Sequence, residues 1–273
     1  MNHLNVVYTI WLRDLTTFIR ERSRIVGMIG QPLLYLLIVG VGISSGLSLN
    51  HAPGGINYLR FMYPGIIGMS TLFTSIFSAM SIIWDREFGF LKEVLVAPVP
   101  RWAVAVGKSL GGATVAVLQS IILIALAPFV GVTLTPPMVL EVLALAFLTS
   151  LAMTSLGVVF AARMDSMQGF QMVMNFLVMP LFFLSGGLFP VNSAPSWMKT
   201  LMYIDPLTYG VDGLRNVVFS GTMVKLPGGL QTSLVSLGRH AGLIRWGLGF
   251  DAGVMLLVSL ILTTLGAFSF SLE

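Results

Sequence analysis

The chain has 273 residues, of which 56% are hydrophobic and only 10% are charged. Soluble domains carry about a quarter charged residues, so this composition excludes a water-soluble domain and predicts an all-α integral membrane protein. The formal net charge is only +4, and the basic residues gather at the ends of apolar runs, which argues against nucleic-acid binding. The chain has no cysteine and three widely spaced histidines, so we expect neither disulfides nor a metal site.

Residues 1–24 predict an amphipathic helix that lies in the membrane interface. They lack the continuous apolar core of a signal peptide, because charged residues such as Arg13 and Asp14 interrupt them. Apolar residues nevertheless recur at helical spacing, at Leu4, Val7, Trp11, Leu15 and Phe18. Arg13 falls off this stripe. An ordinary soluble amphipathic helix is the alternative interpretation.

Six apolar runs follow, and together with residues 1–24 they predict one transmembrane domain over residues 1–273. We place the transmembrane helices near residues 25–47, 59–84, 104–131, 138–162, 169–190 and 244–269. Lysine and arginine are enriched on the side of the N-terminus, so the positive-inside rule predicts that both termini are cytoplasmic. We find no convincing internal repeat, which weakens the interpretation as a transporter built from inverted repeats.

The segment between the fifth and sixth runs, residues 191–243, is too apolar for a free loop and too broken to span the bilayer. It predicts short helices that re-enter the outer leaflet, with a small cap lying on the membrane as the alternative. We expect two short helices within residues 186–215, with Asp212 and Arg215 able to pair on an exposed helix face. The candidate residues of an external gate are Gly187, Phe189, Pro190, Trp197, Pro206, Tyr209 and Arg215.

The longest charged interruption between two apolar runs begins at Asp85, after the second run, and is closed by Pro98 and Pro100. Its spacing predicts a short cytoplasmic helix that exposes charged and aromatic side chains, as suits docking into the groove of a soluble partner. A solvated loop that only sets the topology explains the spacing equally well. The residues of this coupling block are Asp85, Arg86, Glu87, Phe88, Gly89, Phe90, Leu91, Lys92, Glu93, Pro98 and Arg101.

Two further sequence features suggest chemistry at first sight. Gly107-Lys108-Ser109 resembles the end of a phosphate-binding loop, but Trp102 stands where that motif requires glycine. We therefore expect a helix start from which Lys108 reaches toward the headgroups, and no nucleotide site or enzymatic activity on this chain. Asp251, about two turns inside the sixth run, is expected to be paired or protonated, because no second acid or histidine lies at comparable depth to form a proton relay.

Two ordered sets of motifs resemble the ABC-2 type permeases, which are membrane subunits of ABC exporters. The first set is Asp85-Arg86-Glu87-Phe88-Gly89-Phe90-Leu91, Ala97-Pro98-Val99-Pro100-Arg101 and Gly107-Lys108. The second is Gly187-Leu188-Phe189-Pro190, Pro195-Ser196-Trp197, Asp205-Pro206-Leu207-Thr208-Tyr209 and Gly213-Leu214-Arg215. The likeness covers residues 58–220 and is strongest to permeases of the daunorubicin-resistance and nodulation-lipooligosaccharide export groups.

This resemblance implies a six-span permease of the plasma or inner membrane that pairs with a second copy as a homodimer or heterodimer. Each copy would dock one soluble ABC ATPase through the coupling block, and ATP and Mg would bind to that ATPase, so this chain would hold no cofactor. The substrate path would lie at the dimer interface, bounded by spans two and five. The candidate lining residues are Met69, Phe73, Phe77, Met172, Asn175, Met179 and Phe183.

The expected function is the export of a hydrophobic or amphipathic molecule (a drug-like compound, lipid or glycolipid) by alternating access. A secondary transporter driven by an ion gradient is the alternative. A membrane anchor without transport is disfavoured by the coupling block. The sequence does not name the substrate, because an aliphatic lining carries little information on specificity.

Overall fold

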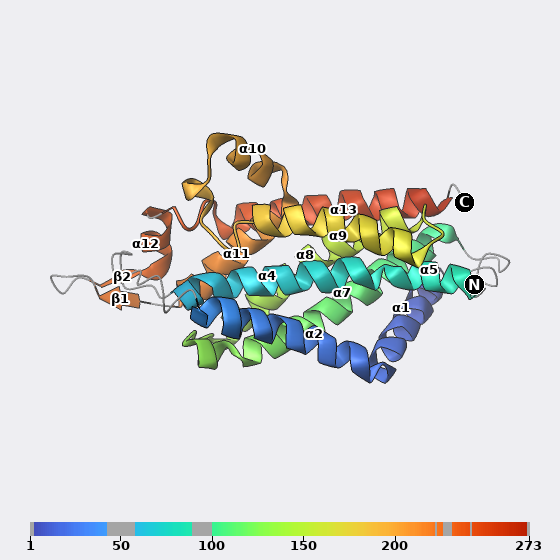
Figure 1. The fold of residues 1–273 in the computed structure, drawn as a ribbon, viewed down its shortest axis with the longest axis horizontal. Coiled ribbons are helices and arrows are strands. Elements are labelled where there is room, and N and C mark those ends of the chain that lie inside the picture. The colour runs from blue at the N-terminus through green and yellow to red at the C-terminus, as the bar shows by residue number, and fades with distance from the viewer. Residues whose placement is uncertain are drawn as a thin grey trace.

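Long apolar helices lie side by side along the length of the molecule (Figure 1). The computed structural model describes residues 3–42, 58–88, 100–221, 223–225, 231–240 and 242–271. Within these residues, five helical segments are long and apolar enough to cross a membrane: Tyr58–Glu87, Arg101–Ala125, Pro136–Ala161, Met167–Leu184 and Leu248–Phe270. The chain is therefore a multi-pass helical membrane protein.

The individual elements follow the predicted runs closely. The first segment consists of α4 (Tyr58–Ser78) and α5 (Met80–Glu87), and the others are α7 (Arg101–Ala125), α8 (Pro136–Ala161), α9 (Met167–Leu184) and α13 (Leu248–Ser271). A 3-10 turn, η2 (Ala127–Val130), follows α7. The first predicted span corresponds to α2 (Arg22–Leu34) and the π-helix η1 (Tyr35–Val41), whose apolar part, Ile25–Ile38, is shorter than the other five. A sixth span therefore stays a prediction.

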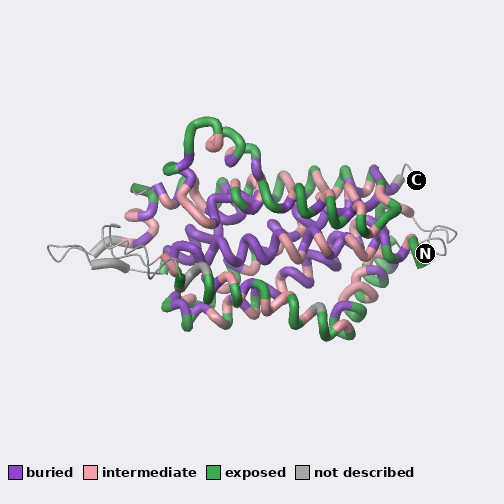
Figure 2. Tube along the Cα trace, viewed as in Figure 1, coloured by how far each residue is buried: buried purple, intermediate pink, exposed green. Residues whose placement is uncertain are grey.

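The middle of the bundle is formed by α4, α7 and α8, where buried residues concentrate (Figure 2). Small residues allow these helices to approach closely. A side chain at Gly112 of α7 would meet Ser78 of α4 and Thr154 of α8, and one at Gly157 would come within 2.8 Å of the Ile76 carbonyl oxygen. In contrast, α9 and α13 lie at the periphery, and most of their residues are only partly buried or exposed.

The N-terminal helix α1 (His3–Arg20) packs against α7, with Ile10 of α1 lying directly over Gly107. Its buried apolar residues are Val6, Ile10 and Phe18, whereas Leu4 is 73% exposed. The predicted apolar stripe is thus shifted around the helix, because Arg13 and Asp14 also turn toward the bundle and bind partners there. The amphipathic helix is present, and its place in the membrane interface stays a prediction.

The chain between α9 and α13 forms a small unit at one end of the bundle (Figure 1). It contains η3 (Val191–Ser193), α10 (Ser196–Ile204), α11 (Pro206–Ser220), the strands β1 (Met223–Lys225) and β2 (Gln231–Ser233), and α12 (Leu234–His240). The two expected helices are confirmed as α10 and α11, and α11 begins at Pro206 as predicted. The antiparallel pair of three-residue strands was not predicted and is the one exception to an all-helical architecture among the described residues. Re-entry into the outer leaflet stays a prediction.

Candidate functional site

The start of the coupling block is the last turn of α5. Asp85 to Phe88 are described, and Arg101 opens α7, whereas Gly89, Phe90, Leu91, Lys92, Glu93 and Pro98 lie outside the described residues. Glu87 and Phe88 are exposed at this tip. Arg86 instead fixes the tip to the turn between α8 and α9, where it donates to the carbonyl oxygens of Ala162 and Met164 at 2.8 and 2.9 Å and to Asp165 at 2.9 Å.

Asp85, expected on the docking surface, is buried in an ion cluster that joins α1, α5 and α7. We define the ion cluster as Arg13, Asp14, Asp85 and Lys108. Both terminal nitrogens of Arg13 donate to the Asp85 carboxylate, one of them at 3.0 Å. The Lys108 ammonium lies 2.6 Å from Oδ2 of Asp85 and 2.8 Å from Oδ1 of Asp14, and it also donates to the Ser81 hydroxyl at 3.1 Å. The predicted role of Lys108 is therefore wrong: it is 4% exposed and points into the protein rather than toward the headgroups.

The four charges of the ion cluster balance, which offsets the cost of burying Asp85 and Lys108 and of partly burying Arg13 and Asp14. Burial raises the pKa of Asp14, and the charge and hydrogen bond of Lys108 oppose that shift. For Arg13, burial lowers the pKa, but the hydrogen bond and charge of Asp85 outweigh it and raise the pKa overall. Sequence patterns missed this cluster, although Lys108 was a signal, since a lysine within an apolar span needs a partner.

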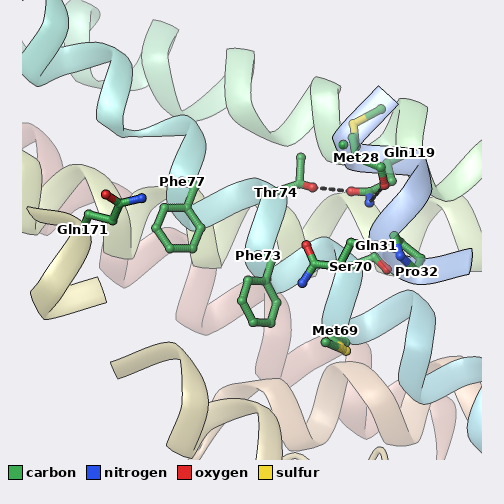
Figure 3. A pocket seen from close by; sticks show the side chains of 11 residues that line it. Met28, Gln31, Pro32, Met69, Ser70, Phe73, Thr74, Phe77, Gln119 and Gln171 are labelled. Atoms are coloured by element: carbon green, nitrogen blue, oxygen red, sulfur yellow. Dashed lines mark hydrogen bonds between the residues drawn. The ribbon is translucent and has the colours of Figure 1, made fainter. Parts of the chain in front are cut away.

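A groove runs alongside the ion cluster. Its upper cavity of about 400 Å³ lies between α2, α4, α7 and α9 (Figure 3), and its lower cavity of about 550 Å³ lies between α1, α4, α5 and α9. The two cavities adjoin, because Phe77 and Gln171 line both. Of the candidate path residues, Met69, Phe73 and Phe77 line the upper cavity, where the two phenylalanine rings stack 6.2 Å apart.

The other candidate path residues form a separate surface on α9. Met172, Asn175, Met179 and Phe183 are exposed, with Met172 at 74%, and Phe176 joins them. Their spacing of three and four residues places them along one side of the helix. Within one copy of the chain, the structure does not bring this α9 stripe together with the described residues of the groove.

Among the external gate candidates, Arg215 of α11 is almost completely buried. Its guanidinium donates to the carbonyl oxygens of Gly186 and Leu243 at 2.9 and 3.0 Å and lies 4.3 Å from the centre of the Phe61 ring. Burial lowers the pKa of Arg215 to about 10, well above neutral pH, so the side chain stays charged. Arg215 thereby ties the break after α9 and the segment before α13 to α4.

The expected surface pair between Asp212 and Arg215 is wrong, because both residues are buried and bind different groups. The Asp212 carboxylate accepts from the backbone N–H groups of Arg245 and Trp246 at 3.0 and 2.9 Å. Burial raises the pKa of Asp212, and the N–H of Trp246 opposes that shift. Both residues lie on α11, which packs against α4, α8 and α13, and this packing buries the two side chains that the sequence placed on an exposed face.

The remaining gate candidates divide between packed and exposed positions. Gly187 contacts the backbone of Gly65 in α4, and Tyr209 packs on Trp246 with ring centroids 4.6 Å apart and donates to the Tyr203 carbonyl oxygen at 2.8 Å. Phe189 packs against the small core under α10, and Pro190 is half-buried beside it. Trp197 is 66% exposed.

Asp251 lies in the first turn of α13, not two turns inside it, and is fully buried. One carboxylate oxygen accepts from the Asn216 side chain of α11 at 3.4 Å. The other has no hydrogen-bond partner among the described residues. The contact between α11 and α13 agrees with a structural pairing.

The spanning helices define a multi-pass membrane protein, and the groove between them is compatible with transport. A model of the ABC-2 type transporter family matches residues 5–219, and the chain belongs to this family.

Named relatives agree with this assignment. The chain is 30% identical over 208 residues to the putative transport permease ycf38 of Cyanophora paradoxa, covering 72% of this chain and 70% of that protein. It is 26% identical to nodulation protein J of Rhizobium leguminosarum bv. trifolii, over 79% of this chain and 82% of the relative. It is 27% identical to the probable multidrug ABC transporter permease YbhR of Escherichia coli K12, over 59% and 44% respectively.

Proposed function

We propose that this permease subunit belongs to an ATP-driven exporter that moves a hydrophobic or amphipathic molecule out of the cytoplasm or the inner leaflet by alternating access. The observation that carries the proposal is the construction of the α5 tip. Glu87 and Phe88 are exposed there, while Asp85 and Arg86 fasten the same turn to α1, α7 and the α8–α9 turn. A push on this tip would therefore reach several helices at once, as a rigid-body switch requires.

ATP and Mg would bind to a separate ABC ATPase subunit, and this chain would hold no cofactor. Gly107-Lys108-Ser109 lies inside α7, with Lys108 engaged in the ion cluster. A phosphate-binding loop needs a glycine-rich turn before a helix and a lysine free to reach phosphate. This segment offers neither.

A second copy of the permease would cover the α9 stripe. The exposed side of α9 is an apolar face formed by Met172, Phe176, Met179 and Phe183. Its two methionines support contact with a partner helix, because flexible thioether side chains adapt to varied surfaces. The path expected at the dimer interface would then run between α4 and α9 of two copies.

The topology would place six spans in the cell membrane with both termini in the cytoplasm. In support, α1 begins and α13 ends at the end of the bundle where α5 ends, while α10 to α12 lie at the opposite end (Figure 1). The end of α5 and the helices α10 to α12 would thus face opposite sides of the membrane.

Charge reversal at the tip tests the proposal. We expect Glu87→Lys to abolish co-purification with the co-expressed ATPase and vanadate-sensitive transport of a fluorescent amphipathic dye into inverted vesicles. Glu141→Lys makes the same charge change at an exposed site near the other end of the bundle and should leave both intact. Transport that survives vanadate but stops when the ion gradient is collapsed would support the secondary transporter instead.

A further inference from the structure

We propose that the groove is a binding site, within a single copy, for an amphipathic molecule whose apolar body carries no net charge. The proposal rests on the proposed export function and identifies where the cargo binds and its chemical class. It differs from the path expected between two copies, because the lining described above comes from helices of one chain.

The upper cavity is apolar with a few neutral hydrogen-bonding groups. Its lining combines Met28, Pro32, Met69 and the stacked rings of Phe73 and Phe77 (Figure 3). Its polar groups are the amides of Gln31, Gln119 and Gln171 and the hydroxyls of Ser70 and Thr74. None of the described lining residues is charged. A volume of about 400 Å³ falls in the range of pockets for small organic ligands.

One amide of this cavity is fixed, and two remain accessible. Gln119 donates to the Met28 carbonyl oxygen at 2.7 Å and accepts from the Thr74 hydroxyl, so it joins α2, α4 and α7 around the cavity. Gln31 and Gln171 are exposed and border the same space from α2 and α9. An ester, amide or hydroxyl group of a ligand could exchange hydrogen bonds with them, whereas a hydrocarbon alone would leave them without any.

The lower cavity suits the polar end of the same molecule. It is bordered by Arg13, Asp14 and Asp85 of the ion cluster, by the carboxylate of Glu21, by Thr17 and by the aromatic rings of Trp84 and Phe88. The ion cluster has no net charge, since its two cations and two carboxylates bind one another. With Glu21, the charged groups of the groove all line the lower cavity, beside the polar end of the ligand, and none of the described residues that line the upper cavity offers a countercharge to the apolar body.

The charge of the ligand follows from this arrangement. A full charge carried into the upper cavity would lose its hydration and find no opposite charge among the described lining residues, which is strongly unfavourable. An uncharged body with hydrogen-bonding groups loses much less. The groove therefore selects a neutral apolar body and leaves the polar end beside the ion cluster.

Two glycines of α2 provide a matched test. A side chain at Gly27 or at Gly30 meets no atom within 4 Å, but only Gly27 is among the residues that line the upper cavity. Because a Cβ at Gly27 meets open space, Gly27→Phe should place its ring in the upper cavity, whereas Gly30→Phe adds the same ring to the same helix at a residue that does not line the cavity.

The experiment uses the full-length permease in lipid nanodiscs without ATP or ATPase. Three photoreactive aromatic probes of equal length carry in the body a neutral amide, a quaternary ammonium or a carboxylate. We expect saturable labelling by the amide probe at peptides that contain Met28, Met69 or Phe73, and affinity for both charged probes weaker by about tenfold or more, a difference of about 1.4 kcal/mol. Gly27→Phe should weaken amide binding by a similar factor, and Gly30→Phe should not.

Several outcomes would overturn the inference. Equal or tighter binding of a charged probe would refute the ligand class, and unchanged binding by Gly27→Phe would refute the site. Labelling that is lost in Met172→Trp but kept in Gly27→Phe would place the molecule between two copies. Because binding is measured without ATPase, failure here leaves the exporter test of Glu87→Lys unaffected, and failure of that test leaves this result interpretable.

Discussion

Removing the Lys108 ammonium should destabilise the folded permease strongly. Lys108→Met keeps the length of the side chain but deletes the group that binds Asp14 at 2.8 Å and Asp85 at 2.6 Å. Arg13 then remains as the only cation of the ion cluster beside two buried carboxylates. Leaving a buried charge without its partner costs about 3–5 kcal/mol.

The magnitude should depend on pH in a direction that the cluster fixes. Lys108 opposes the upward shift that burial imposes on the pKa of Asp14, so its removal lets that pKa rise further. A carboxyl with a raised pKa in the folded state holds a proton that the unfolded chain releases, so stability falls as pH rises toward the folded-state pKa. The loss caused by Lys108→Met should therefore be smaller at pH 5 than at pH 8.

A double variant separates charge balance from packing. Lys108→Met combined with Asp14→Asn removes one charge of each sign and leaves Arg13 paired with Asp85. We expect most of the lost stability to return, because a balanced deletion of a buried pair is often nearly neutral.

Thermal unfolding in one detergent at pH 5 and pH 8 measures both effects. For a chain of this size, about 2–4 °C per kcal/mol predicts a Tm lower by roughly 10 °C for the single variant at pH 8. The reasoning is refuted if Lys108→Met unfolds at the wild-type temperature at pH 8, or if the double variant is less stable than the single one.

Three other outcomes are expected. Gly65→Ala places a methyl group 2.6 Å from the Cα of Gly187 and should lower the free energy of unfolding by about 1–3 kcal/mol. A methyl group at Gly253 meets no atom within 4 Å, so Gly253→Ala should not lower the Tm. Burial raises the pKa of Asp205 to about 8, so stability should fall as pH rises from about 4 to 8. Asp205→Asn keeps an oxygen that can cap α11 and should make the Tm less dependent on pH in thermal unfolding scans, and an unchanged pH dependence would contradict this explanation. In this cysteine-free chain, Phe88→Cys should react with an impermeant maleimide only in inverted vesicles and Ile204→Cys only in intact cells, and the reverse pattern would overturn the proposed topology.

The spans and the external helices could be predicted because they depend on local sequence. The length of an apolar run predicts a helix that crosses the bilayer. Backbone preferences predict where helices end and begin: Gly186 adopts a φ of 73° just after α9, and Pro206 begins α11. The strands β1 and β2 carry no comparable signal, since three residues are too few for a period to be read.

The partners of charged residues could not be predicted, because they are far apart in sequence. Arg13 and Asp85 are 72 positions apart, and Lys108 lies 94 positions from Asp14. Arg215 binds backbone carbonyls, which leave no trace in residue identity. The sequence therefore predicted surface positions for Asp85, Lys108 and Arg215, where single charged residues usually lie.

Gly65 lies against the backbone of Gly187, just after α9, and this contact leaves the rod formed by α4 and α5 little freedom to tilt. Gly65 and Asp85 are 20 positions apart in the sequence, which corresponds to roughly 30 Å along helical backbone. Tilting a rod of that length by about 5° moves its far end by about 3 Å, the scale of a van der Waals contact. At Gly65 main chain lies against main chain, so no flexible side chain can absorb such a displacement. A tilt started near the ion cluster must therefore either displace the break after α9 or bend at Ala79, the single residue between α4 and α5.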